Sequence, residues 1–289
     1  MNDSLQAPSD PTIYLVDGTA YIYRAYHAIR HLSNSSGIPT NAVFGYTRML
    51  LKLIEDRQPD YVALFFDAKG PTFRHDLYTA YKANRPPMPE DLVLQLPWIR
   101  EVTQAFNLSR MEMSGYEADD LIGTQARAAE KAGFNVVIVT GDKDFMQLVS
   151  RRITIWDPMK DRHIDQAYIR DQWGIDPLQF VEVMGLWGDA ADNVPGVPGI
   201  GEKTALKLIK AHHSIEELYD QVDTITAKKL REKLIEYKEQ ALLSRTLVTI
   251  RLDAPLEFDP QDYKVQEPDL QALAQLFKQL EFRQLQQAF

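Results

Sequence analysis

The sequence predicts an α/β protein in which a parallel-rich sheet with flanking helices is followed by a mainly helical region. Three apolar runs support the sheet, at residues 13–16, 61–66 and 135–140. Continuous apolar runs of this length are typical of strands buried on both faces, as in a parallel sheet. Helical spacing is seen between them at 43–56 and 119–132, and Gly133 is a common residue just beyond a helix end. Alternating strands and helices favour βαβ units.

The second half, from about residue 177, is predicted to be mainly helical. Candidate helices cover 178–187, 203–211, 215–219, 228–247 and 269–280. Residues 253–268 contain three prolines and no helical period, so an extended connection is expected there. The predicted division is a core over residues 1–176 and a helical region over 177–289.

Composition excludes several classes of protein. The chain has 289 residues, of which 45% are hydrophobic and 25% charged, as in ordinary globular proteins. No apolar run reaches the roughly 18 residues of a membrane span, and Met1 to Pro11 lacks the features of a signal peptide. The expected location is the cytoplasm. Cysteine is absent, which excludes disulfides and thiolate metal sites.

An aspartate ends each of the three predicted strands: Asp17, Asp67 and Asp142. In an open parallel sheet, ligands collect at the carboxyl ends of the strands. A single aspartate there is equally typical of a helix N-cap. Three in equivalent places favour a shared site over three separate caps.

Further acids lie in short clusters after the strands and after one helix. They are Glu117, Asp119, Asp120, Asp144, Asp189 and Asp192. Taken locally, each cluster also fits a helix first turn, a turn or a cap. The nine acids together equal the formal net charge of −9, so the acidity is concentrated in one candidate site. Convergent carboxylates repel one another unless cations bind.

Oxygen ligands of this kind suit hard divalent cations such as Mg²⁺. Two such ions about 4 Å apart can activate a water and stabilise the leaving oxygen in phosphodiester hydrolysis. The six histidines lack convincing ligand spacing, so no zinc pattern competes.

A glycine-rich stretch at 193–205 is the most specific motif in the sequence. Gly196, Gly199 and Gly201 permit a tight turn with exposed backbone, and a helix is predicted to begin near Glu202. Backbone N–H groups at a helix start can hold a phosphate, and Lys203 adds positive charge. The stretch resembles a helix-hairpin-helix over about 188–212, which grips the DNA backbone without reading sequence. A plain turn between helices is the alternative.

A basic, aromatic segment covers residues 69–89. It contains Lys69, Arg74, Lys82 and Arg85 against one acid, with Phe73, Tyr78 and Tyr81 interleaved. Cations and aromatic rings together suit a single strand of nucleic acid. A solvated loop with a few packed aromatic rings is the alternative.

Together these motifs resemble the flap endonuclease and 5′-nuclease family, including the 5′-nuclease domain of bacterial DNA polymerase I. The matching stretches occur in family order at 15–18, 66–69, 73–75, 81–85, 115–120, 140–144, 188–193 and 193–205. The resemblance covers nearly the whole chain. It implies a PIN-like core, a helical arch over about 69–100 and a helix-hairpin-helix region.

The resemblance also implies roles for individual residues. One metal ion would lie near Asp67, Glu117 and Asp119, and a second near Asp142, Asp144, Asp189 and Asp192. Asp17 and Asp120 would support the site, partly through bound waters. Lys82 and Arg85 would contact the scissile phosphate. Arg24, Arg74 and Tyr81 would help to hold DNA, and a K⁺ ion would lie between the hairpin carbonyls and a phosphate.

The expected activity is two-metal hydrolysis of DNA at 5′ flaps, nicks, overhangs and RNA-primed strands, as in replication and repair. Mg²⁺ is the expected ion, with Mn²⁺ as an expected substitute. The expected state is a monomer, either free-standing or a fragment of a longer polymerase chain. A module that binds branched DNA without cutting is one alternative. A ribonuclease on a PIN-like core is another.

Overall fold

The computed structural model describes residues 10–286, so most of the polar N-terminal segment lies outside the described residues. Its centre is a six-stranded sheet in the order β3-β2-β1-β4-β5-β6. All neighbouring strands are parallel except β6, which is antiparallel to β5. The strands are β1 (Thr12–Asp17), β2 (Tyr61–Phe65), β3 (Ser109–Met111), β4 (Asn135–Val139), β5 (Ile153–Asp157) and β6 (Arg162–Ile164).

Strand β1 lies at the centre of the sheet and is buried on both faces. Ile13 pairs in register with Tyr61 of β2 on one side and with Val136 of β4 on the other. Ile13 and Leu15 contribute to one hydrophobic cluster, while Val16 contributes to a second cluster on the opposite face. The predicted parallel strands are therefore confirmed, and their continuous apolar character follows from burial on both sides.

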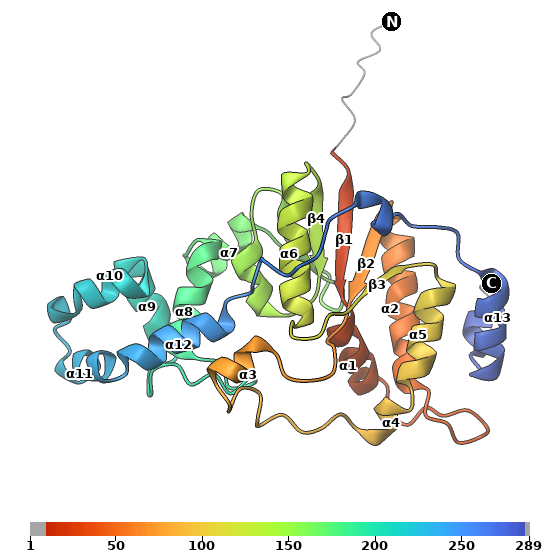
Figure 1. The fold of residues 1–289 in the computed structure, drawn as a ribbon, viewed down its shortest axis with the longest axis horizontal. Helices are drawn as coiled ribbons and strands as arrows, with labels where there is room; N and C mark the ends of the chain where they lie inside the picture. The colour runs from red at the N-terminus through yellow and green to blue at the C-terminus, as the bar shows by residue number, and fades with distance from the viewer. Residues whose placement is uncertain (1–9, 287–289) are drawn as a thin grey trace, which may run out of the picture.

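Helices cover both faces of the sheet (Figure 1). Helix α6 (Ala118–Lys131) packs against β1 and β4. The opposite face carries α1 (Gly18–Ala28), α2 (Asn41–Arg57) and α5 (Leu96–Ala105). Helix α7 (Gln166–Trp173) follows β6. The α/β core predicted from the sequence is confirmed.

A helical region extends from one end of this core (Figure 1). Its elements are η2 (Pro177–Gln179), α8 (Phe180–Trp187), α9 (Glu202–His212), α10 (Ile215–Asp220), η3 (Val222–Thr224), α11 (Lys228–Glu236) and α12 (Lys238–Val248). The single helix predicted over 228–247 was wrong. The chain breaks at Tyr237, whose φ of −105° and ψ of 21° lie outside helical values, so α11 and α12 are separate.

The last helices return to the core, at the end opposite α10 (Figure 1). Helix α13 (Leu270–Gln279) packs against α5, and α14 (Arg283–Gln286) follows it. Residues 253–268 form the predicted extended connection, apart from the short η4 (Pro260–Tyr263). Across residues 10–286, no helix combines the length and the apolar character that crossing a membrane requires.

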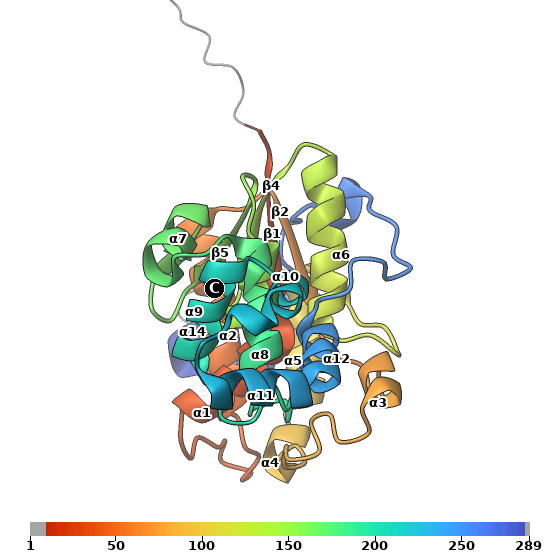
Figure 2. The same ribbon diagram turned by 90° about the vertical axis from the view of Figure 1, so that its left-hand side faces the viewer.

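The predicted arch over residues 69–100 is less helical than expected. It contains only α3 (Phe73–Leu77), α4 (Glu90–Val93) and the start of α5. Between α3 and α4 the chain forms turns, where Pro86, Pro87 and Pro89 lack the N–H that a helix needs. In Figures 1 and 2 this segment crosses below the carboxyl ends of the strands.

Candidate functional site

The carboxyl edge of the sheet holds the first two acids. Asp17 ends β1, and its oxygens accept hydrogen bonds from the Ala20 amide at 2.9 Å and the Thr140 hydroxyl at 3.0 Å. Asp67 follows β2, and its Oδ1 accepts from the Ala118 amide at 2.8 Å. The negative charge of Asp67 is therefore stabilised by the positive end of the α6 dipole.

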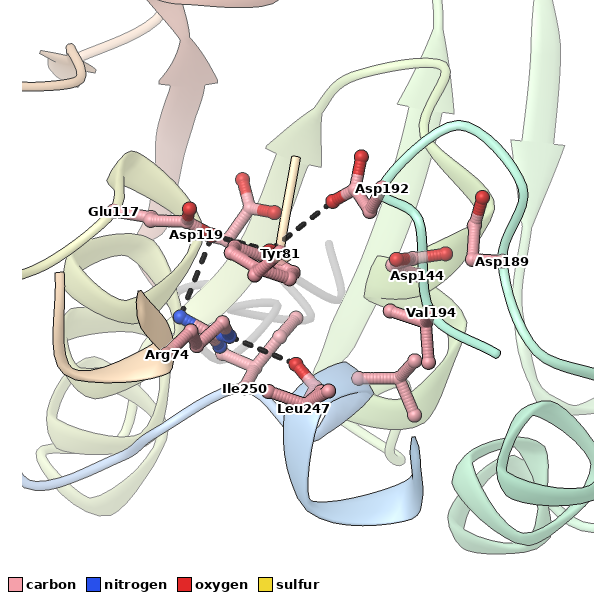
Figure 3. A pocket seen from close by; sticks show the side chains of 11 residues that line it. Arg74, Tyr81, Glu117, Asp119, Asp144, Asp189, Asp192, Val194, Leu247 and Ile250 are labelled. Carbon is pink, nitrogen blue, oxygen red and sulfur yellow. Dashed lines mark hydrogen bonds and ion pairs between the residues drawn. The ribbon is translucent and has the colours of Figure 1, made fainter. Parts of the chain in front are cut away.

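Glu117 and Asp119 lie at the start of α6 and face the edge where Asp17 and Asp67 lie. Figure 3 shows their carboxylates on one side of a small cavity. That cavity is lined by Arg74, Tyr81, Glu117, Asp119, Asp144, Asp189, Asp192, Val194, Leu247, Val248 and Ile250. Five of the nine predicted acids therefore border one space.

Asp120 and Arg74 are placed differently from the expectation. Asp120 is fully buried and accepts two hydrogen bonds of 2.8 Å from Arg74, together with the amides of Glu117 and Arg251. Arg74 is only 2% exposed and also donates to the Leu247 and Thr249 carbonyls. The guanidinium of Arg74 is thus held in the interior by protein acceptors and is not presented to solvent. The carboxylate of Asp120 is engaged by protein donors.

The second group of acids comes from two loops. Asp142 and Asp144 lie at the start of η1 (Lys143–Leu148), and Oδ1 of Asp142 accepts from the Asp144 amide at 2.9 Å. Asp189 and Asp192 lie in the loop after α8, and Oδ1 of Asp189 accepts from the Ala191 amide at 2.8 Å. Figure 3 shows Asp144, Asp189 and Asp192 on the side of the cavity opposite Glu117.

Crowding of these acids changes their proton affinity. Burial, followed by the charges of Asp67 and Asp142, raises the pKa of Asp17 to about 7. Burial and the neighbouring Asp17, Asp142, Asp67 and Glu117 raise the pKa of Asp119 well above its ordinary value. Burial and Asp142 do the same for the pKa of Asp144. Added positive charge would favour the ionised forms of all three.

The arch segment supplies positive charge to this site. The Lys82 ammonium lies 2.6 Å from Glu117 and 3.5 Å from Asp192, and the Arg85 guanidinium pairs with Asp192. Burial alone would lower the pKa of Lys82, but Glu117 and Asp192 outweigh it and raise that pKa. The ammonium therefore stays charged between the two groups of acids.

Backbone and amide hydrogen bonds fix the arch segment on the loop after α8. The Lys82 amide donates to the Asp192 carbonyl at 2.9 Å. The side chain of Asn84 donates to the Ala190 carbonyl at 2.7 Å, and that of Asn193 donates back to Ala80 at 2.6 Å. Residues 80–85 and 189–193 therefore dock as a reciprocal pair.

Tyr81 is buried rather than presented to solvent, at 4% exposure. Its hydroxyl proton is shared between Glu117 at 3.0 Å and Asp192 at 3.1 Å (Figure 3). Burial and these two charges raise the pKa of the phenol, so Tyr81 remains a donor. Arg24 lies elsewhere, on the carboxyl side of β4. It donates to Asp157 at 3.0 Å and lies against Gly141, next to Asp142.

Whether the acids fit divalent cations can be judged from their surroundings. Within residues 10–286, no three carboxylate or imidazole groups have the geometry of a formed metal site. Instead, three basic side chains form ion pairs with these acids: Lys82, Arg85 and Lys143. The Lys143 ammonium lies 3.1 Å from the Asp189 carboxylate. Oδ1 of Asp144 is buried with no hydrogen-bond partner. An all-oxygen set with an orphaned buried oxygen suits Mg²⁺ or Mn²⁺.

The glycine-rich turn joins α8 to α9, and its three predicted glycines have different surroundings: one is buried and two are exposed. Gly196 is buried at a φ of +58°, and a Cβ there would lie 2.4 Å from the Gly188 nitrogen. Its amide donates to Ser244 at 3.0 Å, so its role in the turn is close packing. Gly199, Gly201 and Lys203 are exposed, and Gly201 is the N-cap of α9. The backbone of Gly199 and Gly201 and the side chain of Lys203 are therefore open to solvent at the start of α9.

Sequence reasoning missed two features that hold the acids in place. The buried side chain of Gln147 bonds to the Asp144 carbonyl and to the backbone at Val248 and Ile250. Residues 247–251 in turn bond to Arg74 and Asp120. The contacts made by residues 247–251 join positions 101 to 175 residues apart, so no local pattern indicates them.

Two family models match consecutive parts of the chain. The model of the 5′-3′ exonuclease N-terminal resolvase-like domain matches residues 12–174, and that of the 5′-3′ exonuclease C-terminal SAM fold matches residues 175–271. DNA polymerase I of Bacillus subtilis is 42% identical over 277 residues, which cover 94% of this chain and 32% of that protein. DNA polymerase I of Pseudomonas aeruginosa is 43% identical over 282 residues, 95% of this chain and 31% of that protein. The chain thus spans about a third of these relatives.

Solved structures show the same fold at low identity. The bacteriophage T5 flap endonuclease, in a pseudo-enzyme-product complex with DNA and metal ions, is 18% identical with a TM-score of 0.69, over 94% of this chain and 96% of that one. The catalytic core of Rad2 in complex with DNA substrate is 17% identical with a TM-score of 0.65, over 94% and 88%. A T5 5′-exonuclease with bound zinc ions is 21% identical with a TM-score of 0.68, over 82% and 89%.

Proposed function

Because the chain belongs to the 5′-3′ exonuclease family, we propose that it is a structure-specific 5′-nuclease. Its substrates are DNA with a 5′ flap, nick or overhang and RNA-primed strands, and its products carry a 5′-phosphate. The observation that carries the proposal is the convergence of acids from the start of α6, from η1 and from the loop after α8 on one small cavity. The sheet-edge acids Asp17 and Asp67 lie near enough to raise the pKa of Asp119.

Divalent ions are assigned to two groups of acids. Asp67, Glu117 and Asp119 would hold one ion. Asp142, Asp144, Asp189 and Asp192 would hold the second. Two Mg²⁺ ions, or Mn²⁺ in their place, would supply an activated water and charge stabilisation at the leaving oxygen. Asp17 supports the site through its hydrogen bonds to Ala20 and Thr140.

The arch residues provide positive charge at the scissile phosphate. In this structure Lys82 and Arg85 lie on Glu117 and Asp192. When cations neutralise those acids, the ammonium and guanidinium are free to contact phosphate and to stabilise charge that develops on it. Tyr81 holds the two acid groups together by its shared hydroxyl proton. Arg74 and Asp120 have a structural role, because the guanidinium and the carboxylate neutralise each other and form two hydrogen bonds in the interior.

Duplex DNA is assigned to the helical region, residues 177–289. Chemistry is assigned to residues 1–176, to which the helical region adds Asp189 and Asp192. Gly199, Gly201 and Lys203 present exposed backbone and charge at the start of α9, which suits a DNA phosphate. A K⁺ ion would lie between hairpin carbonyls and that phosphate. Arg24, partly exposed beside Asp142, is placed to reach DNA near the acids.

A panel of labelled substrates in Mg²⁺ tests this function. The panel contains a double-flap DNA, a nicked duplex, an RNA-primed strand and single-stranded RNA of matched length. The proposal expects 5′-phosphate products from the first three and little cleavage of the RNA. Preferred cleavage of single-stranded RNA would favour the ribonuclease alternative. Tight binding of the flap without cleavage would favour the non-cleaving module.

A further inference from the structure

The side chain of Gln147 makes three hydrogen bonds in the interior beneath the acids. Its Nε2 donates to the carbonyls of Asp144 and Val248, each at 2.9 Å, and its Oε1 accepts from the Ile250 amide at 2.9 Å. The residue is 5% exposed. Both N–H donors and the oxygen are used, so these partners fix the orientation of the amide.

The same stretch of backbone is held from the other side by the Arg74–Asp120 pair. Arg74 donates to the Leu247 carbonyl at 2.8 Å and to the Thr249 carbonyl at 3.0 Å. The Arg251 amide donates to Asp120 at 2.9 Å. Alternate residues of 247–251 therefore form hydrogen bonds in opposite directions. Val248 and Ile250 bond to Gln147, and the other three bond to the Arg74–Asp120 pair.

Each of the two sides carries one group of acids. Asp120 caps the start of α6 by accepting from the Glu117 amide at 3.1 Å. Gln147 belongs to η1, whose first residues are the Asp142–Asp144 turn. Figure 3 shows Leu247 and Ile250 below the cavity, with Arg74 near Glu117 and Asp144 on the far side. Residues 247–251 thus form a spacer between the two groups.

We propose that Gln147 is a positioning residue for the hydrolysis: it fixes the Asp142–Asp144 turn to the 247–251 spacer and so sets the separation of the two metal-binding groups. The inference rests on the proposed metal site. Side chains that orient metal ligands typically contribute about 10- to 100-fold to metal affinity or activity. Loss of the Gln147 amide should therefore weaken metal binding without removing any ligand.

Gln147→Met tests the proposal, because it nearly preserves side-chain volume and removes all three hydrogen bonds. The matched control is Gln125→Met. Gln125 is also a fully buried glutamine that bonds across to the C-terminal part of the chain, at Tyr263 and Glu257, on a part of α6 that carries no predicted acid. Both variants should lose comparable stability.

Mn²⁺ affinity is measured from the electron paramagnetic resonance signal of free Mn²⁺, beside flap cleavage rates as a function of Mg²⁺ concentration. Gln147→Met should bind Mn²⁺ about 10- to 100-fold more weakly and regain part of its single-turnover rate at high Mg²⁺. Its affinity for flap DNA in EDTA should stay within about threefold. Gln125→Met should bind Mn²⁺ like the wild type.

Unchanged Mn²⁺ affinity in Gln147→Met, or equal losses in both variants, would overturn the positioning role while leaving the proposed nuclease intact. Failure of the wild type to bind Mn²⁺ would overturn the metal site itself. If Gln147→Met does not fold, amide hydrogen exchange in the wild-type protein, with and without Mg²⁺, tests the positioning role. Mg²⁺ should slow exchange of the Ile250 amide by at least about tenfold and leave that of Ala254, which bonds to Thr124, unchanged. Equal exchange at Ile250 with and without Mg²⁺ would overturn the proposal.

Discussion

The Asp119 carboxylate faces four other acids, Asp17, Asp142, Asp67 and Glu117, which raise its pKa together with burial. We expect Asp119→Ala to reduce the single-turnover rate of flap cleavage at least about a thousandfold, because a metal ligand contributes several kcal/mol to transition-state stabilisation. DNA affinity measured in EDTA should change little. Asp223→Ala, at an exposed position of η3, is the control. Near-normal turnover in Asp119→Ala would exclude the metal assignment.

Lys82 has a backbone φ of 55°, and its ammonium lies between Glu117 and Asp192. Lys82→Ala should slow the chemical step about 10²- to 10³-fold, because a fixed positive charge near the phosphate is lost. Flap affinity should fall much less. Lys69→Ala removes an exposed lysine from the same segment and should cleave normally. An unchanged single-turnover rate for Lys82→Ala would remove it from the catalytic role.

Sequence reasoning at the residue scale found the acids and the arch cations, because their types and spacing carry the chemistry. It could not foresee that Arg74 and Tyr81 are buried. Arg74 is buried because Asp120 and the end of α12 supply four hydrogen-bond acceptors to its guanidinium. Those acceptors come together only when distant segments pack.

At the scale of elements, α12 connects the glycine-rich turn with the acids. Ser244 and Gln240 on this helix bond to the backbone of Gly196 at 3.0 and 2.6 Å. The helix then leads into the 247–251 spacer. The element that supports the proposed duplex contact therefore also supports the proposed metal site.

The start of α9 should bind duplex DNA through phosphates. Replacing the exposed Lys203 and Lys207 by alanine should weaken flap binding and reduce the slope of log affinity against log salt by about two, since each lost phosphate contact removes about one. The single-turnover rate at saturating enzyme should be retained. Lys131→Ala, at the far end of α6, should leave the slope unchanged. An unchanged slope in the double variant would remove α9 from the DNA interface.

Element prediction succeeded where the pattern is long and regular. The apolar strands β1, β2 and β4 were predicted, whereas β3, β5 and β6 were missed. Strands β3 and β6 have three residues each, which is too few to show an alternation. The 228–247 helix was predicted as one element because its apolar spacing is continuous. Its break is a change in the backbone angles of one residue, Tyr237, which the apolar spacing does not indicate.

At the scale of the whole molecule, the crowded acids should oppose folding when metal is removed. The folded-state pKa of Asp17 is raised to about 7, so the folded protein binds more protons than the unfolded chain between about pH 4 and pH 7. Stability therefore falls as pH rises through that window. In EDTA, Asp17→Asn should raise the melting temperature by several degrees at pH 8 and much less at pH 4. An equal effect at both pH values would contradict this account.

The central claim is that this chain cuts DNA at a site made from its own acids and divalent cations. Cleavage of a 5′-labelled double-flap DNA, in Mg²⁺ and in EDTA, tests it most directly. The account predicts cutting at the flap junction in Mg²⁺ and none in EDTA, with Asp119→Ala inactive in both. Equal cutting in EDTA, or tight flap binding with no cutting in Mg²⁺, would contradict it.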